Sequence, residues 1–299
     1  MIDGVWHIDE PAAGTDGQGR FERARSTLRQ PIPADRAQED LHLFAAWNCP
    51  WAHRAMITRA LLGLDGIALS LAQPRRTDQG WVFSEGDDPL LGAAALHEVY
   101  SAGADRYSGR VTMPVLWDKT TGAALNNESA DIVRDLDRHF APGTLYPADK
   151  ADAIDEWNAL IYPTLNNGVY RAGFATTQQA YDEAVHQVFE TLDRIETQLA
   201  RTRYLTGDAI TEADVRLMPT LLRFDVAYHS AFKCNRNRIV DFANIWGYAR
   251  DLYQQPGVAE TVDFDVYRRG YHSPSPNRNP LGIVPIGPKL DWDAPHNRN

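Results

Sequence analysis

A predicted strand, a cysteine–proline turn and a predicted helix follow one another directly, and this order constrains the fold more than any other feature. The apolar run at residues 41–46 (LHLFAA) is typical of a buried strand. A helix is predicted over residues 51–62, where apolar side chains recur at helical spacing, and a second strand over residues 67–71. A strand, a helix and a strand in so short a span predict a βαβ unit whose two strands run parallel.

A long polar excursion at residues 72–109 follows this unit, and a connection of that length in a compact domain is usually functional. Two more strands are predicted at residues 111–118 and 123–125. A helix is then predicted to begin near Asn127 and to run to about residue 140, with acidic residues in its first turn. The first half of the chain is therefore predicted to be a small α/β domain.

The pattern changes to long helices after a linker rich in proline and glycine at residues 141–147. Over residues 178–200 apolar side chains recur alternately every four and every three positions, which is typical of a helix in a bundle core. The predicted class is therefore α/β followed by all-α. The predicted parts are an extended arm at residues 1–40, the α/β domain at 41–140, an all-helical domain at 148–265 and an extended, proline-rich tail at 266–299.

Composition and charge exclude several classes of function. The chain has 299 residues, of which 43% are hydrophobic and 23% charged, as in ordinary globular proteins. Its formal net charge of −10 would repel a phosphate backbone, so we expect no nucleic-acid partner. No apolar run approaches the roughly 20 residues that span a bilayer, and the first residues lack a signal-peptide pattern. We therefore expect no membrane partner and a cytoplasmic location.

The two cysteines, Cys49 and Cys234, are too few for a disulfide scaffold and fit a reducing compartment. Neither belongs to a Cys-x-x-Cys pair, so a structural zinc site is not expected, and the common nucleotide-binding motifs are absent. We assign Cys234 a structural role.

Cys49 has the position of a reactive thiol, between a buried strand and the first turn of a helix. The N–H groups of that turn and the helix dipole favour a thiolate, and cysteines so placed have pKa values of roughly 3.5–7.5. Pro50 suits the first helical position, where a missing N–H costs nothing. The alternative is an inert thiol packed against Trp51. Because Ala52 stands where a dithiol oxidoreductase has its second cysteine, a mixed disulfide on Cys49 would need an outside thiol to resolve it.

Several motifs in one consistent order resemble those of the glutathionyl-hydroquinone reductases, the Xi class of glutathione transferases. They are NCPWAHR at residues 48–54, GWVF at 80–83, RVTMP at 110–114, NNES at 126–129, GVYRAGFA at 168–175, HSAFKCN at 229–235, DLYQQPGVAE at 251–260 and NPLGIVP at 279–285. The resemblance covers about residues 41–288. It implies a thioredoxin-like N-terminal domain, a C-terminal all-helical glutathione-transferase domain and a homodimer.

The resemblance also implies a glutathione site, with glutathione as co-substrate and with neither a metal nor a nucleotide. A cis peptide bond before Pro114 would present the Met113 backbone to the cysteinyl part of glutathione. Glu128 and Ser129 would hold the γ-glutamyl end at a helix N-terminus, although an ordinary helix cap explains these two residues equally well. The implied glutathione-binding residues are Trp81, Arg110, Val111, Thr112, Met113, Glu128 and Ser129.

Three tyrosines match family positions in the second half of the chain. Tyr170 would exchange a proton with the aromatic substrate, and Tyr228 and Tyr271 would direct their hydroxyls at the cysteine sulfur and lower its pKa. Each could instead be a core residue with a satisfied hydroxyl.

The implied reaction removes glutathione from an S-glutathionyl-hydroquinone through a Cys49–glutathione disulfide, which a second glutathione resolves to oxidised glutathione. One rival is an Omega-like thiol transferase or dehydroascorbate reductase, which would use Cys49 but would not need Tyr170. The other is a non-catalytic ligand-binding module, in which Cys49 would react as an ordinary thiol.

Overall fold

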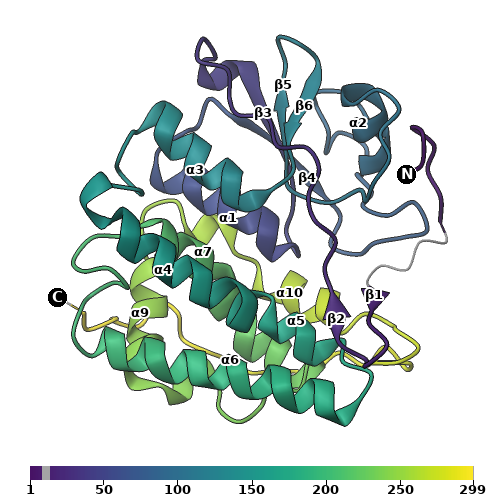
Figure 1. The fold of residues 1–299 in the computed structure, drawn as a ribbon. Helices are drawn as coiled ribbons and strands as arrows, with labels where there is room; N and C mark the ends of the chain where they lie inside the picture. The colour runs from purple at the N-terminus through teal and green to yellow at the C-terminus, as the bar shows by residue number, and fades with distance from the viewer. Residues whose placement is uncertain (9–13, 299) are drawn as a thin grey trace. The chain divides into compact units, whose positions relative to one another are not determined.

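The computed structural model describes residues 1–8 and 14–298 and divides the chain into two compact units (Figure 1). The first unit comprises Met1–Ala12 and Ala24–Pro142, and the second comprises Ala13–Arg23 and Gly143–Asn299. Each unit has its own core and is described by itself.

A four-stranded sheet with the order β4-β3-β5-β6 forms the centre of the first unit. Its strands are β3 (Leu41–Ala46), β4 (Ala68–Ala72), β5 (Val115–Asp118) and β6 (Ala123–Asn126). β3 and β4 are parallel, with Leu43 opposite Leu69, whereas β5 runs antiparallel to both β3 and β6. The predicted βαβ unit is thus confirmed, and every residue of β3 is buried because the strand lies inside the sheet.

Three helices accompany this sheet: α1 (Pro50–Leu61), α2 (Leu96–Gly103) and α3 (Ser129–Phe140). α1 and α3 pack side by side, and α2 contacts β6 (Figure 1). The sequence predicts α1 and α3 but not α2, which lies within the excursion at 72–109. α2 has only eight residues, so its apolar side chains repeat too few times to distinguish a helix from a polar loop. The strand predicted to begin at residue 111 begins at Val115, beyond Pro114, since proline cannot donate to the ladder.

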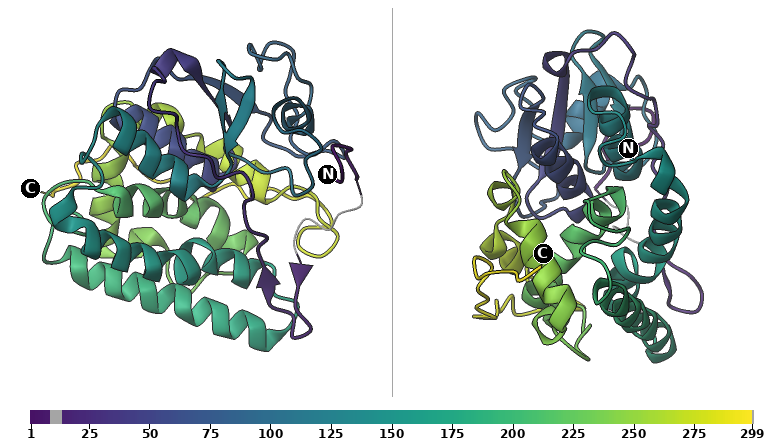
Figure 2. Two further views of the ribbon diagram at one scale, coloured as in Figure 1. Left: turned by 45° about the horizontal axis from the view of Figure 1, so that its top comes forward. Right: turned by 90° about the vertical axis from the view of Figure 1, so that its left-hand side faces the viewer.

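The second unit is helical, apart from the short hairpin of β1 (Gly14–Thr15) and β2 (Phe21–Glu22). Its α-helices are α4 (Ala151–Ile161), α5 (Gly168–Gly173), α6 (Gln178–Leu199), α7 (Glu212–Arg223), α8 (His229–Ala231), α9 (Ala243–Tyr253) and α10 (Phe264–Tyr271). α6, the long green helix in the left view of Figure 2, contacts α5 and α9 and buries the apolar stripe predicted for it. A capping box between Thr211 and Asp214 begins α7.

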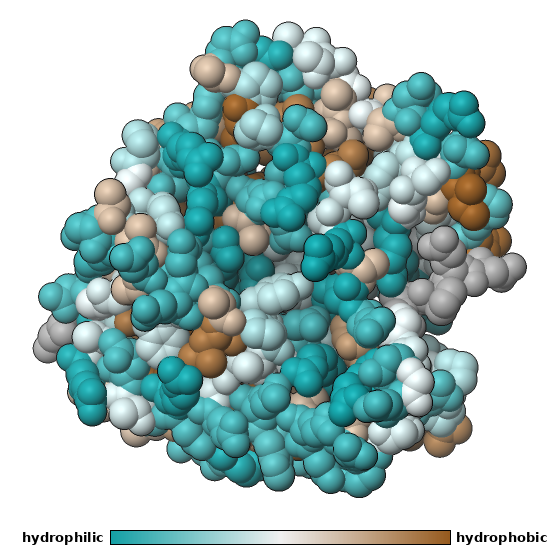
Figure 3. All heavy atoms as spheres, viewed as in Figure 1, coloured by the Kyte–Doolittle hydropathy of each residue, from teal (hydrophilic) through white to brown (hydrophobic). Residues whose placement is uncertain are grey.

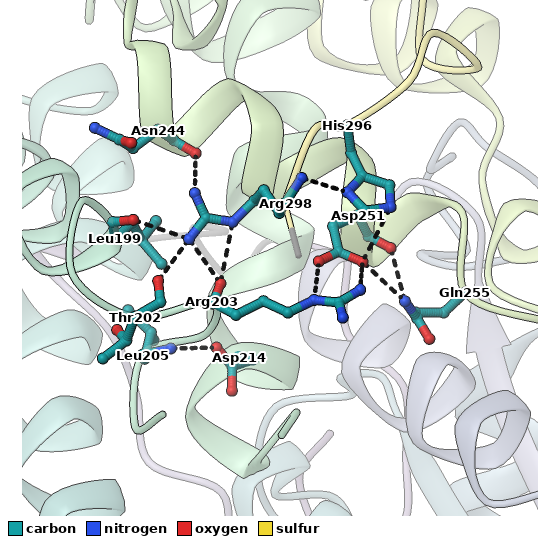
Figure 4. A network of polar contacts seen from close by, with 10 residues as sticks. All are labelled: Leu199, Thr202, Arg203, Leu205, Asp214, Asn244, Asp251, Gln255, His296 and Arg298. Atoms are coloured by element: carbon teal, nitrogen blue, oxygen red, sulfur yellow. Dashed lines mark hydrogen bonds and ion pairs between the residues drawn. The ribbon is translucent and has the colours of Figure 1, made fainter. Parts of the chain in front are cut away.

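The last part of the chain is fastened to the second unit by specific contacts rather than by helical structure. The indole of Trp292 stacks on Phe264 at 5.0 Å and is 6% exposed. The guanidinium of Arg298 donates to the carbonyl oxygens of Leu199 and Thr202 at 2.9 and 2.6 Å (Figure 4). These carbonyls lie at and just beyond the C-terminal end of α6, where a cation is favourable.

The face of the molecule shown in Figure 3 is mostly hydrophilic, and its hydrophobic residues form small separate groups. Among the described residues, no helix has both the length and the apolar composition required to cross a membrane.

Candidate active site

Cys49 lies where β3 ends and α1 begins, as the sequence predicts. It is the N-cap residue of α1, Pro50 occupies the first turn, and the cysteine is 8% exposed. Its sulfur is 3.6 Å from the carbonyl oxygen of Met113. The first turn of α1 therefore places its N–H groups and its positive dipole end beside this sulfur.

The Met113–Pro114 peptide bond is cis, as the family resemblance implies. A buried tyrosine holds the residue before this turn: the hydroxyl of Tyr100 donates to the Thr112 carbonyl at 2.8 Å and accepts the Thr112 N–H at 3.3 Å. Burial raises the pKa of Tyr100 to about 12, so its hydroxyl remains a donor at neutral pH. Tyr100 belongs to α2, and the sequence predicts neither this helix nor the support it gives.

Glu128 and Ser129 form the start of α3. Glu128 is the N-cap, and its Oε1 accepts the Ala130 N–H at 3.1 Å, so the interpretation as a helix cap holds for this side chain. Ser129 is 3% exposed, and its Oγ accepts a hydrogen bond of 3.4 Å from Arg54, which is 2% exposed. A serine hydroxyl, the positive end of a helix dipole and a buried cation together suit a carboxylate ligand.

The excursion that carries Trp81 is fastened to the sheet by a chain of buried hydrogen bonds. Ser70 Oγ on β4 lies 2.8 Å from His42 Nε2 on β3 and donates to Asp88 Oδ1 at 2.8 Å. Asp88 in turn accepts the backbone N–H of Ala93 at 2.9 Å. Trp81 is half-buried, and its carbonyl accepts the N–H of Leu96 at the start of α2, at 2.8 Å. The excursion is therefore an ordered part of the first unit.

The three predicted tyrosines meet in the second unit, although more than 100 residues separate Tyr170 from Tyr271. The Tyr271 hydroxyl oxygen is 2.7 Å from that of Tyr170 and 3.2 Å from that of Tyr228. Tyr170 comes from α5, Tyr228 from the π-helical turn Phe224–Tyr228 that extends α7, and Tyr271 from the end of α10. We call these three residues the tyrosine cluster.

Burial keeps the hydroxyls of Tyr228 and Tyr271 protonated. Burial raises the pKa of Tyr228 and of Tyr271 well above the ordinary value, and the Tyr170 hydroxyl raises both further. The guanidinium of Arg223, which is 0% exposed, opposes this shift. Arg223 packs over the ring of Tyr267 at 3.7 Å. The sequence does not predict Arg223 as a site residue; its one signal is an arginine that ends the apolar run of α7.

Aromatic rings surround Tyr170. Phe174 stacks parallel to it at 6.2 Å, and Phe232 meets it edge-on at 5.2 Å. Arg23 lies over the Tyr170 ring at 4.8 Å, and Arg278 lies over Phe174 at 4.1 Å. Flat rings with cations over their faces are suited to an aromatic ligand that carries oxygen substituents.

Family models match both halves of the chain. The model described as "Glutathione S-transferase, N-terminal domain" matches residues 48–139, and that of the C-terminal domain matches residues 178–251. The chain belongs to the glutathione S-transferase family. Its thioredoxin-like N-terminal domain and its helical C-terminal domain are those of this family, which confirms the predicted fold class.

Relatives of the chain carry the name implied by its motifs. Glutathionyl-hydroquinone reductase YqjG of Escherichia coli (strain K12) is 44% identical, over 100% of this chain and 98% of the relative. Glutathionyl-hydroquinone reductase PcpF of Sphingobium chlorophenolicum is 45% identical over 96% of each. The solved "Xi Class GST from Natrialba magadii" is 41% identical with a TM-score of 0.90, and covers 100% of this chain and 95% of that chain. The resemblance to the Xi class is thus confirmed.

Proposed function

We propose that this glutathione transferase reduces S-glutathionyl-hydroquinones to hydroquinones, with glutathione as co-substrate. The observation that carries the proposal is a single cysteine at the N-cap of α1, beside a cis Met113–Pro114 turn, with alanine at position 52. One thiol in this position suits formation of a mixed disulfide that an outside thiol resolves. The two relatives named glutathionyl-hydroquinone reductase support the choice of substrate.

The first unit would bind glutathione. Ser129 and the N–H groups that begin α3, with Arg54 behind them, would hold the γ-glutamyl end beside Glu128. The Met113 backbone would pair with the cysteinyl residue, so that its sulfur approaches Cys49. Residues 110–112 would line the same edge, and Trp81 would cover the bound tripeptide.

In the first step, the aromatic carbon that bears the sulfur accepts a proton and a ring hydroxyl releases one, so that the ring becomes a keto tautomer. The Cys49 thiolate attacks the glutathione sulfur, the carbon–sulfur bond breaks, and its electron pair restores the aromatic ring as a phenolate, which takes up a proton. Tyr170 is suited to deliver the proton, because its hydroxyl is paired with that of Tyr271 at 2.7 Å and lies among aromatic rings. The products are a hydroquinone and a Cys49–glutathione disulfide.

In the second step, a second glutathione thiolate attacks the glutathione sulfur of this disulfide. Oxidised glutathione leaves, and Cys49 returns to the thiolate. The family resemblance gives Tyr228 and Tyr271 the role of donors to the cysteine sulfur. Their high pKa values suit that role, since a protonated hydroxyl stabilises a thiolate by donating to it.

We further propose a homodimer in a reducing, cytoplasmic setting. Both cysteines are free thiols and both are buried, which fits such a compartment.

A coupled assay for oxidised glutathione, with a glutathionyl-hydroquinone and free glutathione as substrates, tests the proposal. The wild-type chain should turn over, the Cys49→Ala variant should be inactive, and Tyr170→Phe should be strongly impaired. Absence of wild-type turnover, with a Cys49 that reacts with iodoacetamide no faster than an ordinary thiol, would instead indicate the non-catalytic binding module.

An Omega-like thiol transferase is the second candidate. "Glutathione S-transferase omega-like 2" of Schizosaccharomyces pombe (strain 972 / ATCC 24843) is 37% identical over 90% of this chain and 94% of that relative. This function requires only the first-unit site. Two results would favour the thiol transferase. The wild-type chain would be inactive towards glutathionyl-hydroquinones, and Tyr170→Phe would retain full activity towards dehydroascorbate.

A further inference from the structure

Arg278 lies in the tail that follows α10, beside the aromatic rings that surround Tyr170. Its guanidinium carbon is 4.1 Å from the centre of the Phe174 ring and 5.7 Å from that of the Phe232 ring. Both rings pack on Tyr170, with their centres 6.2 and 5.2 Å from that of the tyrosine ring. No step of the proposed reaction uses Arg278.

The turn that carries Arg278 is tied to His272, the residue after Tyr271. The two ends of the turn pair through the backbone: the Ser275 N–H donates to the Asn279 carbonyl at 3.1 Å, and the Asn279 N–H donates to the Ser275 carbonyl at 3.0 Å. The Asn279 side chain donates to the carbonyl of His272, which is 6% exposed. These contacts hold Arg278 in place beside the tyrosine cluster.

Arg278 is exposed, and in the part of the chain that the structure describes its guanidinium makes neither a hydrogen bond nor an ion pair. Two other arginines near the tyrosine cluster are engaged by the protein. Arg23, over the Tyr170 ring, donates to Asn167 Oδ1 at 2.8 Å. Arg223 is fully buried. Stacking on a ring leaves the N–H groups at the edge of the Arg278 guanidinium available, and an anion can accept two of them.

The charge of Arg278 reaches the hydroxyls of the tyrosine cluster. The rings beside the guanidinium exclude part of its water and lower the pKa of Arg278, whereas the Tyr170 and Tyr271 hydroxyls have the opposite effect. Both hydroxyls therefore lie within electrostatic range of this cation. An anion that forms on a ligand beside Tyr170 would lie within the same range.

The proposed reaction forms such an anion. In a glutathionyl-hydroquinone only the hydroxyl next to the sulfur-bearing carbon can become the keto oxygen, because the other hydroxyl is not conjugated with the protonated carbon. When the Cys49 thiolate forms the sulfur–sulfur bond, the electron pair of the broken carbon–sulfur bond moves through the ring to that oxygen. The negative charge of the thiolate thus reappears on a phenolate oxygen, next to the carbon that Tyr170 is proposed to protonate.

We propose that Arg278 is a further catalytic residue, whose guanidinium donates hydrogen bonds to the ring oxygen that becomes the phenolate when the carbon–sulfur bond breaks. A cation placed where negative charge develops lowers the barrier, because the charge on that oxygen increases in the transition state. The inference rests on the proposed function, which supplies the aromatic ligand. Tyr170 then serves the carbon of the broken bond, and Arg278 serves the neighbouring oxygen.

Binding of small aromatic ligands to the full-length chain tests the inference without turnover. The ligands are 4-nitrophenolate, in a buffer basic enough to ionise it, and 4-nitroanisole, the uncharged methyl ether. Titration calorimetry gives both Kd values. The variants are Arg278→Gln and the matched control Arg250→Gln, because Arg250 also lies over a ring, that of Trp246 at 4.9 Å, but belongs to α9.

We expect the wild-type chain to bind the nitrophenolate about tenfold more tightly than the anisole. Arg278→Gln should remove this preference by weakening the nitrophenolate alone, and Arg250→Gln should preserve it. Similar affinities of the wild-type chain for the two ligands, or no detectable binding of either, overturn the inference. Equal weakening of both ligands by Arg278→Gln overturns it as well.

Single-turnover release of the hydroquinone measures the carbon–sulfur step itself. Arg278→Gln should slow this step about tenfold, less than the roughly 10² to 10³ lost at enclosed oxyanion sites, because water screens an exposed cation. Arg278→Lys, which keeps the charge, should recover most of the rate. The loss should be smaller for ring-fluorinated substrates, whose phenolates are more stable. An equal loss with every substrate, without recovery in Arg278→Lys, would indicate a structural role and overturns the inference.

The two measurements separate this result from the proposed function. If the wild-type chain prefers the nitrophenolate through Arg278 but does not reduce glutathionyl-hydroquinones, the proposed function is wrong, whereas the phenolate site at Arg278 stands. If wild-type turnover is normal and Arg278→Gln matches Arg250→Gln in both measurements, only the role of Arg278 is wrong.

Discussion

The thiol site of the first unit and the tyrosine cluster of the second are assembled in opposite ways. Cys49 is placed by its immediate neighbours: the end of β3, Pro50 and the first turn of α1 follow one another in sequence. The tyrosine cluster joins three helical segments through hydroxyl contacts of 2.7 and 3.2 Å. The first arrangement is fixed by local backbone geometry, whereas the second exists only when the helices are packed.

The cysteines give the largest expected contrast. Cys49→Ser should lower turnover by about a thousandfold or more, because a serine hydroxyl at neutral pH cannot replace the thiolate. Cys234→Ser, the matched control, should retain activity, since burial raises the pKa of Cys234 to about 12 and keeps it a neutral thiol. Turnover in the coupled assay and mass spectrometry of the glutathione adduct check both outcomes. Adduct formation on Cys234 would contradict this assignment.

Tyr170→Phe should impair the reaction that needs the tyrosine cluster and spare the reaction that needs only the thiol site. We expect the rate with a glutathionyl-hydroquinone to fall by about 10² to 10³, the contribution of a positioned proton donor. Exchange of glutathione with a simple mixed disulfide should change less than twofold, because that step requires only the thiol site. Tyr162→Phe, at a residue that is 43% exposed, is the control. A parallel loss in both reactions would mean that Tyr170 supports the thiol itself.

The two units should also respond to acid with opposite signs. Burial lowers the pKa of His42 to about 4, so between pH 6.5 and 4 the unfolded chain binds a proton that the folded chain does not. The first unit should therefore lose up to roughly 3 kcal/mol of stability as the pH falls through this range. In the second unit, burial raises the pKa of Asp225 to about 6, so the folded form binds the extra proton and gains stability between pH 6 and 4.

Urea unfolding at pH 7 and pH 5 checks the direction of each change in the free energy of unfolding. It is measured in the wild-type chain, in His42→Gln and in Asp225→Asn. His42→Gln should remove part of the acid sensitivity, and Asp225→Asn should increase it. The same pH dependence in all three proteins would contradict both assignments.

Ser129→Ala should give the smallest effect and leave the tyrosine cluster untouched. We expect the KM for glutathione to rise about fivefold with little change in kcat, because one hydrogen bond to a carboxylate is lost while the N–H groups of α3 remain. Steady-state kinetics over a range of glutathione concentrations gives both constants. A fall in kcat without a change in KM would place Ser129 outside the binding site.

The sequence predicted the parts of the site that depend on local order. The βαβ unit, the N-cap position of Cys49 and the stripe of α6 are all present in the structure, and the helix predicted to begin near Asn127 begins at Ser129. It did not predict α2 or the contact of Tyr100 with Thr112, because eight residues in a polar excursion give too weak a period. Arg223 was missed as well, since a buried cation beside tyrosines is a product of packing.

The predicted arm and tail also differ from the structure, because their contacts depend on residues that are distant in sequence. The sequence predicts residues 1–40 as one extended segment, yet the structure assigns Ala13–Arg23 to the second unit and places Phe21 on Phe174 at 5.3 Å. The tail was predicted to begin at residue 266, but α10 continues to Tyr271 and brings that tyrosine to the cluster. Segments rich in glycine and proline carry little periodic signal, and their partners are distant in sequence.

By itself, the sequence determined the strand–helix–strand order around Cys49, the single-thiol character of the site and the family. Each of these follows from neighbouring residues or from motifs read in order: Cys49 before Pro50, and alanine at position 52. Only the tertiary structure decided which side chains meet, as in the tyrosine cluster and in the stacking of Arg278 on Phe174. Hydroxyls 43 and 101 residues apart come within hydrogen-bond distance because packing, which acts over space and not along the chain, brings their helices together.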